Sequence, residues 1–109
     1  MKDSPFPPEW DKRNSPRQAV GVMVTIPPGD KKIMTRDLSQ EGCFLPGVDL
    51  GPVGTEVSIR MDIPGFGLLA LQGKVVHKGR ENEGTGMEFV SLSSEAIEWL
   101  DQFLSIFNA

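Results

Sequence analysis

The feature that most constrains this chain is an alternation of apolar and polar side chains between turns rich in glycine and proline. In residues 56–63 every second side chain is apolar, namely Val57, Ile59, Met61 and Ile63. Successive side chains of a strand point to opposite faces, so this pattern predicts a strand with one buried face. The same alternation occurs in residues 20–26. With 12 glycines and 9 prolines among 109 residues, a fold of short strands and many turns is expected, and a helix bundle is not.

The remaining chain divides into further strands and one helix. Extended segments are predicted at residues 31–38, 43–45, 68–77 and 87–90, with a bulge or bend at Gly73. Short strands separated by regular turn signals are typical of an antiparallel barrel or sandwich. At the end of the chain the spacing becomes helical, with Ser93 or Ser94 as N-cap and an apolar stripe through Ile97, Leu100, Phe103 or Leu104, and Phe107. We therefore expect a flexible N-terminal arm at 1–18, a β-core at 19–92 and a C-terminal helix at 93–109.

Charge is distributed unevenly along the chain. The net charge is −4, yet residues 1–36 carry seven basic and four acidic side chains, and the rest carry four basic and eleven acidic ones. The acidic total argues against binding to nucleic acid polymers, whereas the N-terminal excess permits a small local anion site. No apolar run has the length of a membrane span or a signal peptide. With Cys43 as the single cysteine, a cytoplasmic protein without disulfides is expected.

Two short motifs carry the chemistry of a candidate binding site. Arg13 and Arg17 form an RxxxR spacing before the first strand, and arginine forks suit phosphate oxygens and the O6/N7 edge of guanine. Asp37, Ser39 and Gly42 form a DxSxxG spacing between two strands. The carboxylate can accept guanine N1 and N2 protons, the hydroxyl can donate, and glycine permits positive φ or close approach of the backbone. Taken singly, the motifs also fit two solvated arginines and an ordinary polar turn.

Catalysis and metal binding have little support in the sequence. His77 is the single histidine and has no triad or metal-site pattern around it, and no P-loop is present. We therefore expect no enzyme activity, no metal and no cofactor. Trp10 is either an aromatic side chain that docks on a ligand or an ordinary tail residue.

Together, the motifs resemble the PilZ domain family over about residues 11–107. The matching features are RxxxR, DxSxxG about twenty residues later, the entry 54–57 into the alternating strand, the GxV-like strand 73–76, and the final strand 86–89 before a helix. The resemblance implies a six-stranded antiparallel β-barrel followed by a helix, and a stand-alone receptor that binds the bacterial second messenger cyclic di-GMP.

The resemblance also implies roles for individual residues. Arg13 and Arg17 would contact guanine edges and phosphates as the arm closes, while Asp37 and Ser39 hold a guanine and Gly42 keeps the backbone close. Lys12 stands where many relatives have another arginine, which leaves the affinity and the number of bound nucleotides open. The receptor would pass the signal to an unknown downstream protein. The regulated process would be motility, surface polysaccharide or pilus function. The receptor itself is expected to be a monomer or a weak dimer. The alternative is a PilZ-like adaptor that binds proteins and no nucleotide.

Overall fold

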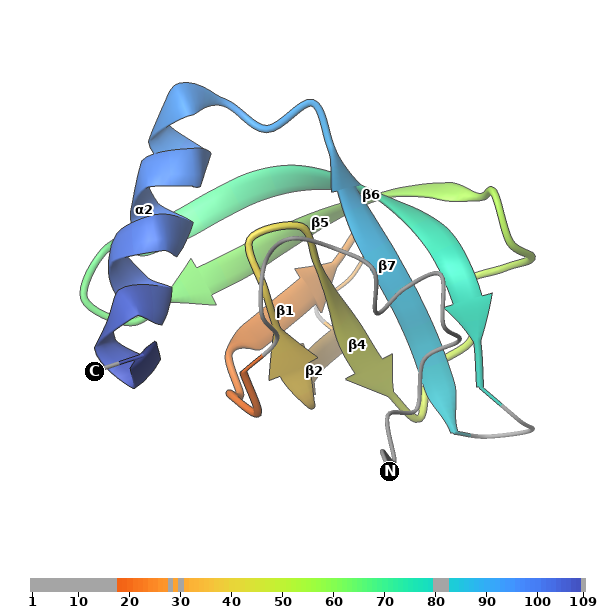
Figure 1. Ribbon diagram of the computed structural model, residues 1–109. Coiled ribbons are helices and arrows are strands. Elements are labelled where there is room, and N and C mark those ends of the chain that lie inside the picture. The colour runs from red at the N-terminus through yellow and green to blue at the C-terminus, as the bar shows by residue number, and fades with distance from the viewer. Residues whose placement is uncertain (1–17, 28, 30, 80–82, 109) are drawn as a thin grey trace.

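The computed structural model describes residues 18–27, 29, 31–79 and 83–108 (Figure 1). Its elements are β1 (Met23–Ile26), β2 (Lys31–Met34), β3 (Asp37–Leu38), β4 (Gly42–Pro46), β5 (Glu56–Ile63), β6 (Gly67–Lys78), β7 (Gly84–Val90), α2 (Ser94–Ser105) and the short 3-10 helix η1 (Ile106–Asn108). The strands form one antiparallel sheet in the order β2-β1-β5-β6-β7-β4-β3. The predicted mainly β architecture with a C-terminal helix is confirmed.

The predicted alternation places the apolar side chains of the strands in one core. In β5 the side chains of Ile59, Met61 and Ile63 are buried, and those between them are exposed. The long strand β6 follows the same rule and buries Leu69 and Leu71. Each strand therefore has an inner face toward the core and an outer face, and this distinction places the functional side chains described below.

The sheet curls because the chain passes directly from one of its outer strands to the other. Thr35 and Arg36 alone separate β2 from β3. β2 pairs with β1, whereas Leu38 of β3 pairs with Gln18, which precedes β1 in the chain. Within the described residues, the predicted strand 31–38 is thus bent into two, and a curled sheet of seven strands stands where a barrel of six was expected.

The bend between β2 and β3 is stabilised from inside. The hydroxyl of Thr35 donates to the carbonyl oxygen of Val20 at 2.8 Å and accepts the backbone N–H of Val22 at 2.9 Å. The Thr35 side chain is buried, so these bonds satisfy a polar group that would otherwise be costly to remove from water. These bonds fix the segment that precedes β1 against the bend formed by Thr35 and Arg36.

Helix α2 packs against one end of the sheet, near the turn between β5 and β6 (Figure 1). Its N-cap is Ser93, whose side-chain oxygen accepts the N–H of Ala96 at 3.0 Å, as one of the two predicted caps. The buried stripe is Ala96, Leu100, Phe103 and Leu104. The predicted stripe was wrong at both ends: Ile97 is 52% exposed and Phe107 is 47% exposed, because the buried stripe runs through Ala96 instead.

The bulge in β6 lies beyond the predicted position. The register with β7 shifts between Val75 and His77, whereas Gly73 pairs regularly with Phe89. Gly73 has a different role, because a Cβ at this position would collide with the end of the Met87 side chain. The glycine makes room for a buried methionine.

Candidate functional site

The DxSxxG motif forms the β3–β4 hairpin, and Ser39 closes its turn. The backbone N–H of Ser39 donates to the carbonyl oxygen of Gly42 at 2.9 Å. The Ser39 hydroxyl oxygen accepts the N–H groups of Glu41 at 3.1 Å and Gly42 at 3.2 Å, and its O–H donates to the Gly42 carbonyl at 3.4 Å. The side chain is fully buried. Ser39 therefore shapes the turn from within.

Gly42 begins β4 with an ordinary strand conformation. It is not among the glycines with positive φ, so of the two predicted uses of this residue positive φ is wrong. Its partner in β7 is Glu88, and Gly42 lies on the outer face of the sheet because the next residue, Cys43, points into the core. A strand position without a side chain lets another molecule approach the backbone closely.

Asp37 lies on the outer face of the same hairpin. It pairs with Phe44 in the β3–β4 register, while the adjacent pair, Leu38 and Cys43, points into the core. The Oδ1 atom of Asp37 is shielded from solvent. Burial raises the pKa of the Cys43 thiol, and the nearby Asp37 carboxylate raises it further. The Asp37 carboxylate is therefore partly buried on this face, with its charge close to the core.

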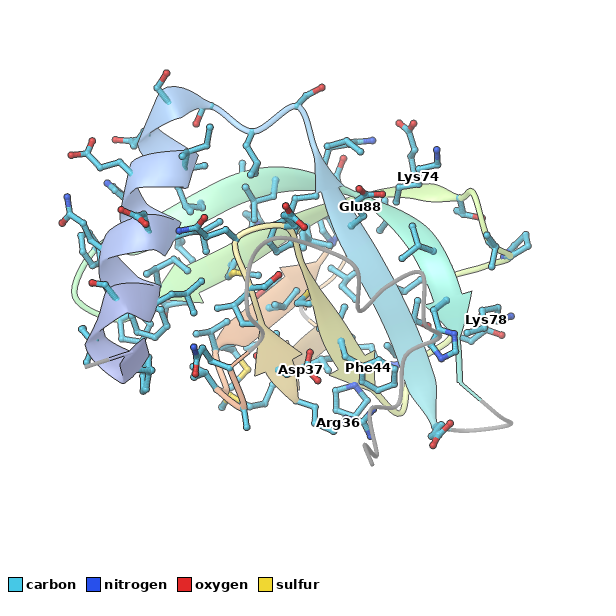
Figure 2. All side chains as sticks on the ribbon, viewed as in Figure 1. Arg36, Asp37, Phe44, Lys74, Lys78 and Glu88 are labelled. Atoms are coloured by element: carbon cyan, nitrogen blue, oxygen red, sulfur yellow. The ribbon has the colours of Figure 1, made fainter. Side chains whose placement is uncertain are left out.

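Arg36 joins Asp37 on this face, as Figure 2 shows. Its backbone N–H donates to the carbonyl oxygen of Phe44 at 2.9 Å, and its guanidinium carbon lies 3.9 Å from the centre of the Phe44 ring. The Phe44 ring is fully buried and has Val76 of β6 beside it, apart from the main core. Arg36 itself is exposed. A cation over an aromatic face is favourable, so Phe44 holds the arginine in place.

Sequence reasoning missed Arg36. In an unbroken strand 31–38, alternation places Arg36 on the face opposite to Asp37. The bend at Thr35–Arg36 breaks that alternation, and the contact with Phe44 depends on the register of the hairpin. The adjacent charges Arg36 and Asp37 were the available signal, together with an aromatic residue a few positions later.

The outer face next to Phe44 has few side chains. Phe44 pairs with Gly86 of β7, and Gly42 pairs with Glu88, which in turn pairs with Lys74 of β6. Lys74 and Glu88 are labelled in Figure 2, above the Arg36–Asp37–Phe44 group. This part of the outer face thus combines two glycine positions with charges of both signs, which can meet the polar edges and phosphates of a ligand.

Lys12, Arg13 and Arg17, and also Trp10, lie outside the described residues. The structure therefore brings Asp37, Ser39 and Gly42 together on one hairpin and does not test the RxxxR half of the site. The first described residue, Gln18, exchanges both backbone hydrogen bonds with Leu38 at 2.9 Å. Gln18, which follows Arg17 in the sequence, is thus paired with Leu38, the residue after Asp37.

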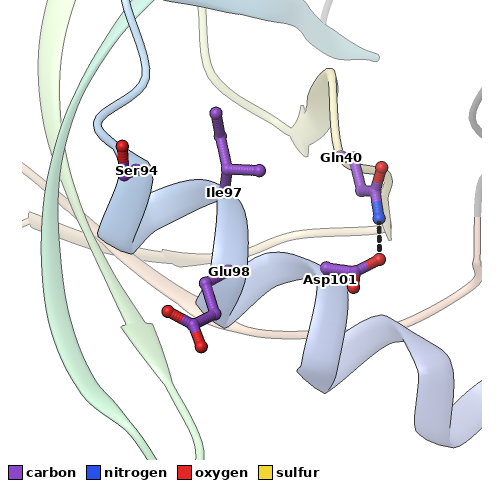
Figure 3. A pocket seen from close by; sticks show the side chains of 5 residues that line it. All are labelled: Gln40, Ser94, Ile97, Glu98 and Asp101. Atoms are coloured by element: carbon purple, nitrogen blue, oxygen red, sulfur yellow. Dashed lines mark hydrogen bonds between the residues drawn. The ribbon is translucent and has the colours of Figure 1, made fainter.

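A pocket of about 390 Å³ lies between the hairpin and helix α2 (Figure 3). It is lined by Gln40, Ser94, Ile97, Glu98 and Asp101. The side-chain amide of Gln40 donates to a carboxylate oxygen of Asp101 at 2.6 Å. Gln40 belongs to the DxSxxG segment, so this bond connects the hairpin that carries Asp37 directly to the C-terminal helix.

Other features add little to the site. In the part of the chain that the structure describes, no three His, Cys, Asp or Glu side chains are grouped so that they could hold a metal ion. None of the described helices combines the length and apolar character needed to cross a membrane. Lys78 of β6 pairs with Asp49 at 3.0 Å, and the hydrogen bond from the Gly51 backbone and the bond to Lys78 lower the pKa of Asp49.

Comparisons with solved structures show proteins of the same fold. YcgR from Escherichia coli in complex with c-di-GMP has a TM-score of 0.70 and 13% identity, with 89% of this chain and 46% of that chain covered. The inhibitor of motility MotI/DgrA from Bacillus subtilis has a TM-score of 0.67 and 13% identity, with 89% and 51% covered. This chain thus spans about half the length of these two structures.

A shorter structure matches over nearly all of its length. It is the PilZ domain of Escherichia coli YcgR with c-di-GMP, with a TM-score of 0.62, 14% identity, and 89% of this chain and 92% of that chain covered. A search of curated proteins finds no match. In a scan of protein families, residues 11–105 match the PilZ domain, a range that contains both motifs and every strand described above. The chain belongs to the PilZ domain family.

Proposed function

We propose that this protein is a receptor for cyclic di-GMP and that the ligand binds on the outer face of the β3–β4 hairpin. The observation that carries the proposal is the pairing of Gln18 with Leu38. Gln18 directly follows Arg17 in the sequence, so this pairing supports a site in which the RxxxR segment acts together with Asp37. The same-fold structures of YcgR with c-di-GMP support the choice of ligand.

The chemistry of the two motifs is complementary to a cyclic dinucleotide. Arg13 and Arg17 supply planar donor forks for the phosphates and guanine edges, and Asp37 accepts the N1 and N2 protons of a guanine. Lys12 adds a positive charge without a planar fork. The number of cyclic di-GMP molecules bound per chain is therefore a quantity to be measured. Because its hydroxyl is buried in the turn, Ser39 acts by shaping the hairpin, and Gly42 keeps the strand free of a side chain.

Binding acts as a switch in this proposal. The arm, residues 1–18, closes over the ligand on the barrel, residues 19–92, and ordering of the arm provides the difference between the free and bound states. The helix, residues 93–109, presents the output to a downstream protein in the cytoplasm. Support comes from the Gln40–Asp101 hydrogen bond, which joins the ligand hairpin to α2 beside the pocket that contains Ile97. No catalytic step is part of the proposal.

Calorimetric titration of the purified chain with cyclic di-GMP tests the proposal, with GTP and cyclic di-AMP as control ligands. We expect saturable binding that is selective for cyclic di-GMP. Arg13→Ala and Arg17→Ala should each weaken binding by tenfold or more, because each removes a charge-assisted, bidentate contact. The matched control is Arg60→Ala, an exposed arginine on β5, which should bind as the parent does.

The melting temperature of each variant separates binding from folding. Because the arm contributes no core residue in this proposal, Arg13→Ala and Arg17→Ala should melt within about 2 °C of the parent, as surface substitutions usually do. Loss of binding together with a large loss of melting temperature would contradict the assignment. No heat and no thermal shift for the parent chain at high ligand concentration would favour the adaptor, for which the Ile97 pocket is the first surface to test.

A further inference from the structure

We propose that Arg36 is a specificity-determining residue of the ligand site. Its guanidinium, held by Phe44, donates to O6 and N7 of the guanine whose N1 and N2 protons Asp37 accepts. This inference rests on the proposed function, because it assigns a further residue to the same cyclic di-GMP site. It adds to the RxxxR arginines a third arginine, one that the described barrel itself positions.

The first argument is placement. The bend after β2 and the bond from the Arg36 N–H to the Phe44 carbonyl turn the arginine side chain to the outer face. Asp37 lies on that face because it pairs with Phe44 across the hairpin. Both charged side chains therefore flank one aromatic ring, and Figure 2 shows the three residues as one group.

The second argument is that Arg36 is held in place by the Phe44 ring, while its N–H donors are not engaged in an ion pair with a described residue. Its guanidinium carbon lies 3.9 Å from the centre of the buried Phe44 ring. Among the described residues, no carboxylate lies within ion-pair distance of this guanidinium. An exposed arginine normally loses much side-chain freedom when it binds a ligand. Here the ring has already removed part of that freedom, and the five N–H donors stay available at the surface.

The third argument is the chemistry that suits a neighbouring cation and carboxylate. Guanine presents acceptors at O6 and N7 next to donors at N1 and N2, so one base can satisfy both side chains. Adenine has an amino donor in place of O6 and lacks the N1 proton. A phosphate oxygen bound by Arg36 would lie next to the negative charge of Asp37. The pair therefore favours a guanine edge over a phosphate.

The fourth argument is access. On the outer face, the strand position opposite Phe44 in β7 is Gly86, and the position two residues before Phe44 is Gly42. Neither places a side chain beyond the ring. At these two positions β4 and β7 therefore place no side chain of their own between a base and the Arg36–Asp37 pair.

The test is a double-mutant cycle between the residue and an atom of the ligand. The parent chain and Arg36→Gln are each titrated with cyclic di-GMP and with its 7-deaza analogue, in which both guanine N7 atoms are replaced by C–H. We expect Arg36→Gln to weaken cyclic di-GMP binding on the order of tenfold to a hundredfold, the range of a bidentate arginine–guanine contact. The penalty for the 7-deaza ligand should be clearly smaller in Arg36→Gln than in the parent, since the cycle isolates that contact.

Two further variants complete the design. Arg36→Lys keeps the charge but not the fork and should behave like Arg36→Gln in the cycle. Arg60→Gln, the matched arginine on β5, should show the parent's affinities and 7-deaza penalty. Melting temperatures near that of the parent for all variants show that the exposed side chains were removed without loss of the fold.

The outcomes separate this inference from the proposed function. If the parent chain does not bind cyclic di-GMP, the proposed function is wrong and this inference fails with it. If the parent binds and Arg36→Gln binds equally well, or shows the full 7-deaza penalty, the inference alone is overturned. If Arg36→Gln instead weakens all cyclic dinucleotides alike and lowers the salt dependence of binding, Arg36 contacts a phosphate, and the base-reading role is likewise overturned.

Discussion

At the scale of single residues, Asp37 and Ser39 have separate roles although one motif contains both. The Asp37 carboxylate lies on the outer face beside Phe44, and in the proposed site it is the acceptor for the ligand. The Ser39 hydroxyl is fully buried and bonds to the backbone of Glu41 and Gly42. In the proposed site Asp37 thus contacts the ligand, and Ser39 fixes the shape of the turn that carries Asp37.

Ser39→Ala should therefore reduce stability. The change leaves the N–H groups of Glu41 and Gly42 without their side-chain acceptor, and loss of such buried bonds costs about 1–3 kcal/mol. Urea denaturation of the parent and the variant measures the difference. Ser58→Ala is the control, because Ser58 donates to Gln72 on the exposed face of the sheet and should change stability by less than about 0.5 kcal/mol. Equal losses for the two variants would refute the structural role of Ser39.

Sequence reasoning could identify Asp37 and Ser39 but not Arg36. The motif depends on residue types at fixed spacing, which are visible in one dimension. The position of Arg36 depends on a bend that ends one strand and begins another, and on the register that places Phe44 opposite Asp37. Alternation carried through that bend assigns Arg36 to the wrong face.

At the scale of elements, the β3–β4 hairpin and helix α2 are connected although 61 residues separate Gln40 from Asp101. The connection is the side-chain hydrogen bond from Gln40 to Asp101, at the edge of the pocket that Ile97 helps to line. It gives the helix a direct contact with the segment that carries Asp37. If the proposed ligand orders the hairpin, this bond is a route to the helix that lies outside the core.

Gln40→Ala should uncouple the helix from the ligand. In the parent, cyclic di-GMP is expected to slow amide hydrogen exchange in α2, because a more ordered hairpin holds Asp101 more firmly. In Gln40→Ala the ligand should still bind, and most of that slowing should disappear. Gln102→Ala is the control, since Gln102 donates to Glu98 within the helix and should keep the parent's response. Unchanged protection of α2 in Gln40→Ala would show that the bond transmits nothing.

The elements themselves were predicted to different degrees. β5 and the N-cap of α2 followed from periodicity and capping chemistry, because both are local. The buried stripe of α2 was predicted through Ile97 and instead runs through Ala96, because the helix is oriented by the sheet that it covers. The division of residues 31–38 into β2 and β3 also depends on distant partners, Val20 and Val22.

At the scale of the whole molecule, one core holds the inner face of the sheet and the helix together, and Cys43 lies within it. Burial raises the pKa of this thiol, and Asp37 adds to the effect. The folded state therefore keeps the thiol protonated, whereas an unfolded thiol ionises near pH 8.5. The contribution of the Cys43 thiol to the free energy of unfolding is fully present below that pH. It is lost as the pH rises toward the raised pKa of the thiol in the folded state.

Two measurements on Cys43 follow from this environment. The free energy of unfolding should fall between pH 8.5 and 10, by up to about 1.4 kcal/mol per pH unit, and Cys43→Ala should show a weaker fall. Iodoacetamide should alkylate the native chain much more slowly than the chain in urea, because the thiolate is the reacting species. Equal alkylation rates, or pH profiles that coincide, would show that the thiol is accessible in the folded protein.

The overall architecture was the most predictable level. Alternation, turns and the final helical spacing predicted a mainly β barrel with a C-terminal helix, because these patterns reflect which face each element buries. The number of strands and the point at which the sheet curls could not be predicted, since a two-residue bend decides both. The DxSxxG hairpin was predictable as a set of residue types, whereas its Arg36 contact and its link to α2 were not, and the RxxxR half of the site stays a prediction.

The way the sheet curls has a consequence for self-association. The free edges of a sheet expose N–H and C=O groups that can pair with another chain, and such edges are where β proteins aggregate. Here both backbone groups of Leu38 in the outer strand β3 are already bonded to Gln18 of the same chain. A neighbouring molecule that adds a strand at this edge must first displace that pairing. The segment that precedes β1 therefore protects this edge of the sheet from pairing with a neighbouring molecule.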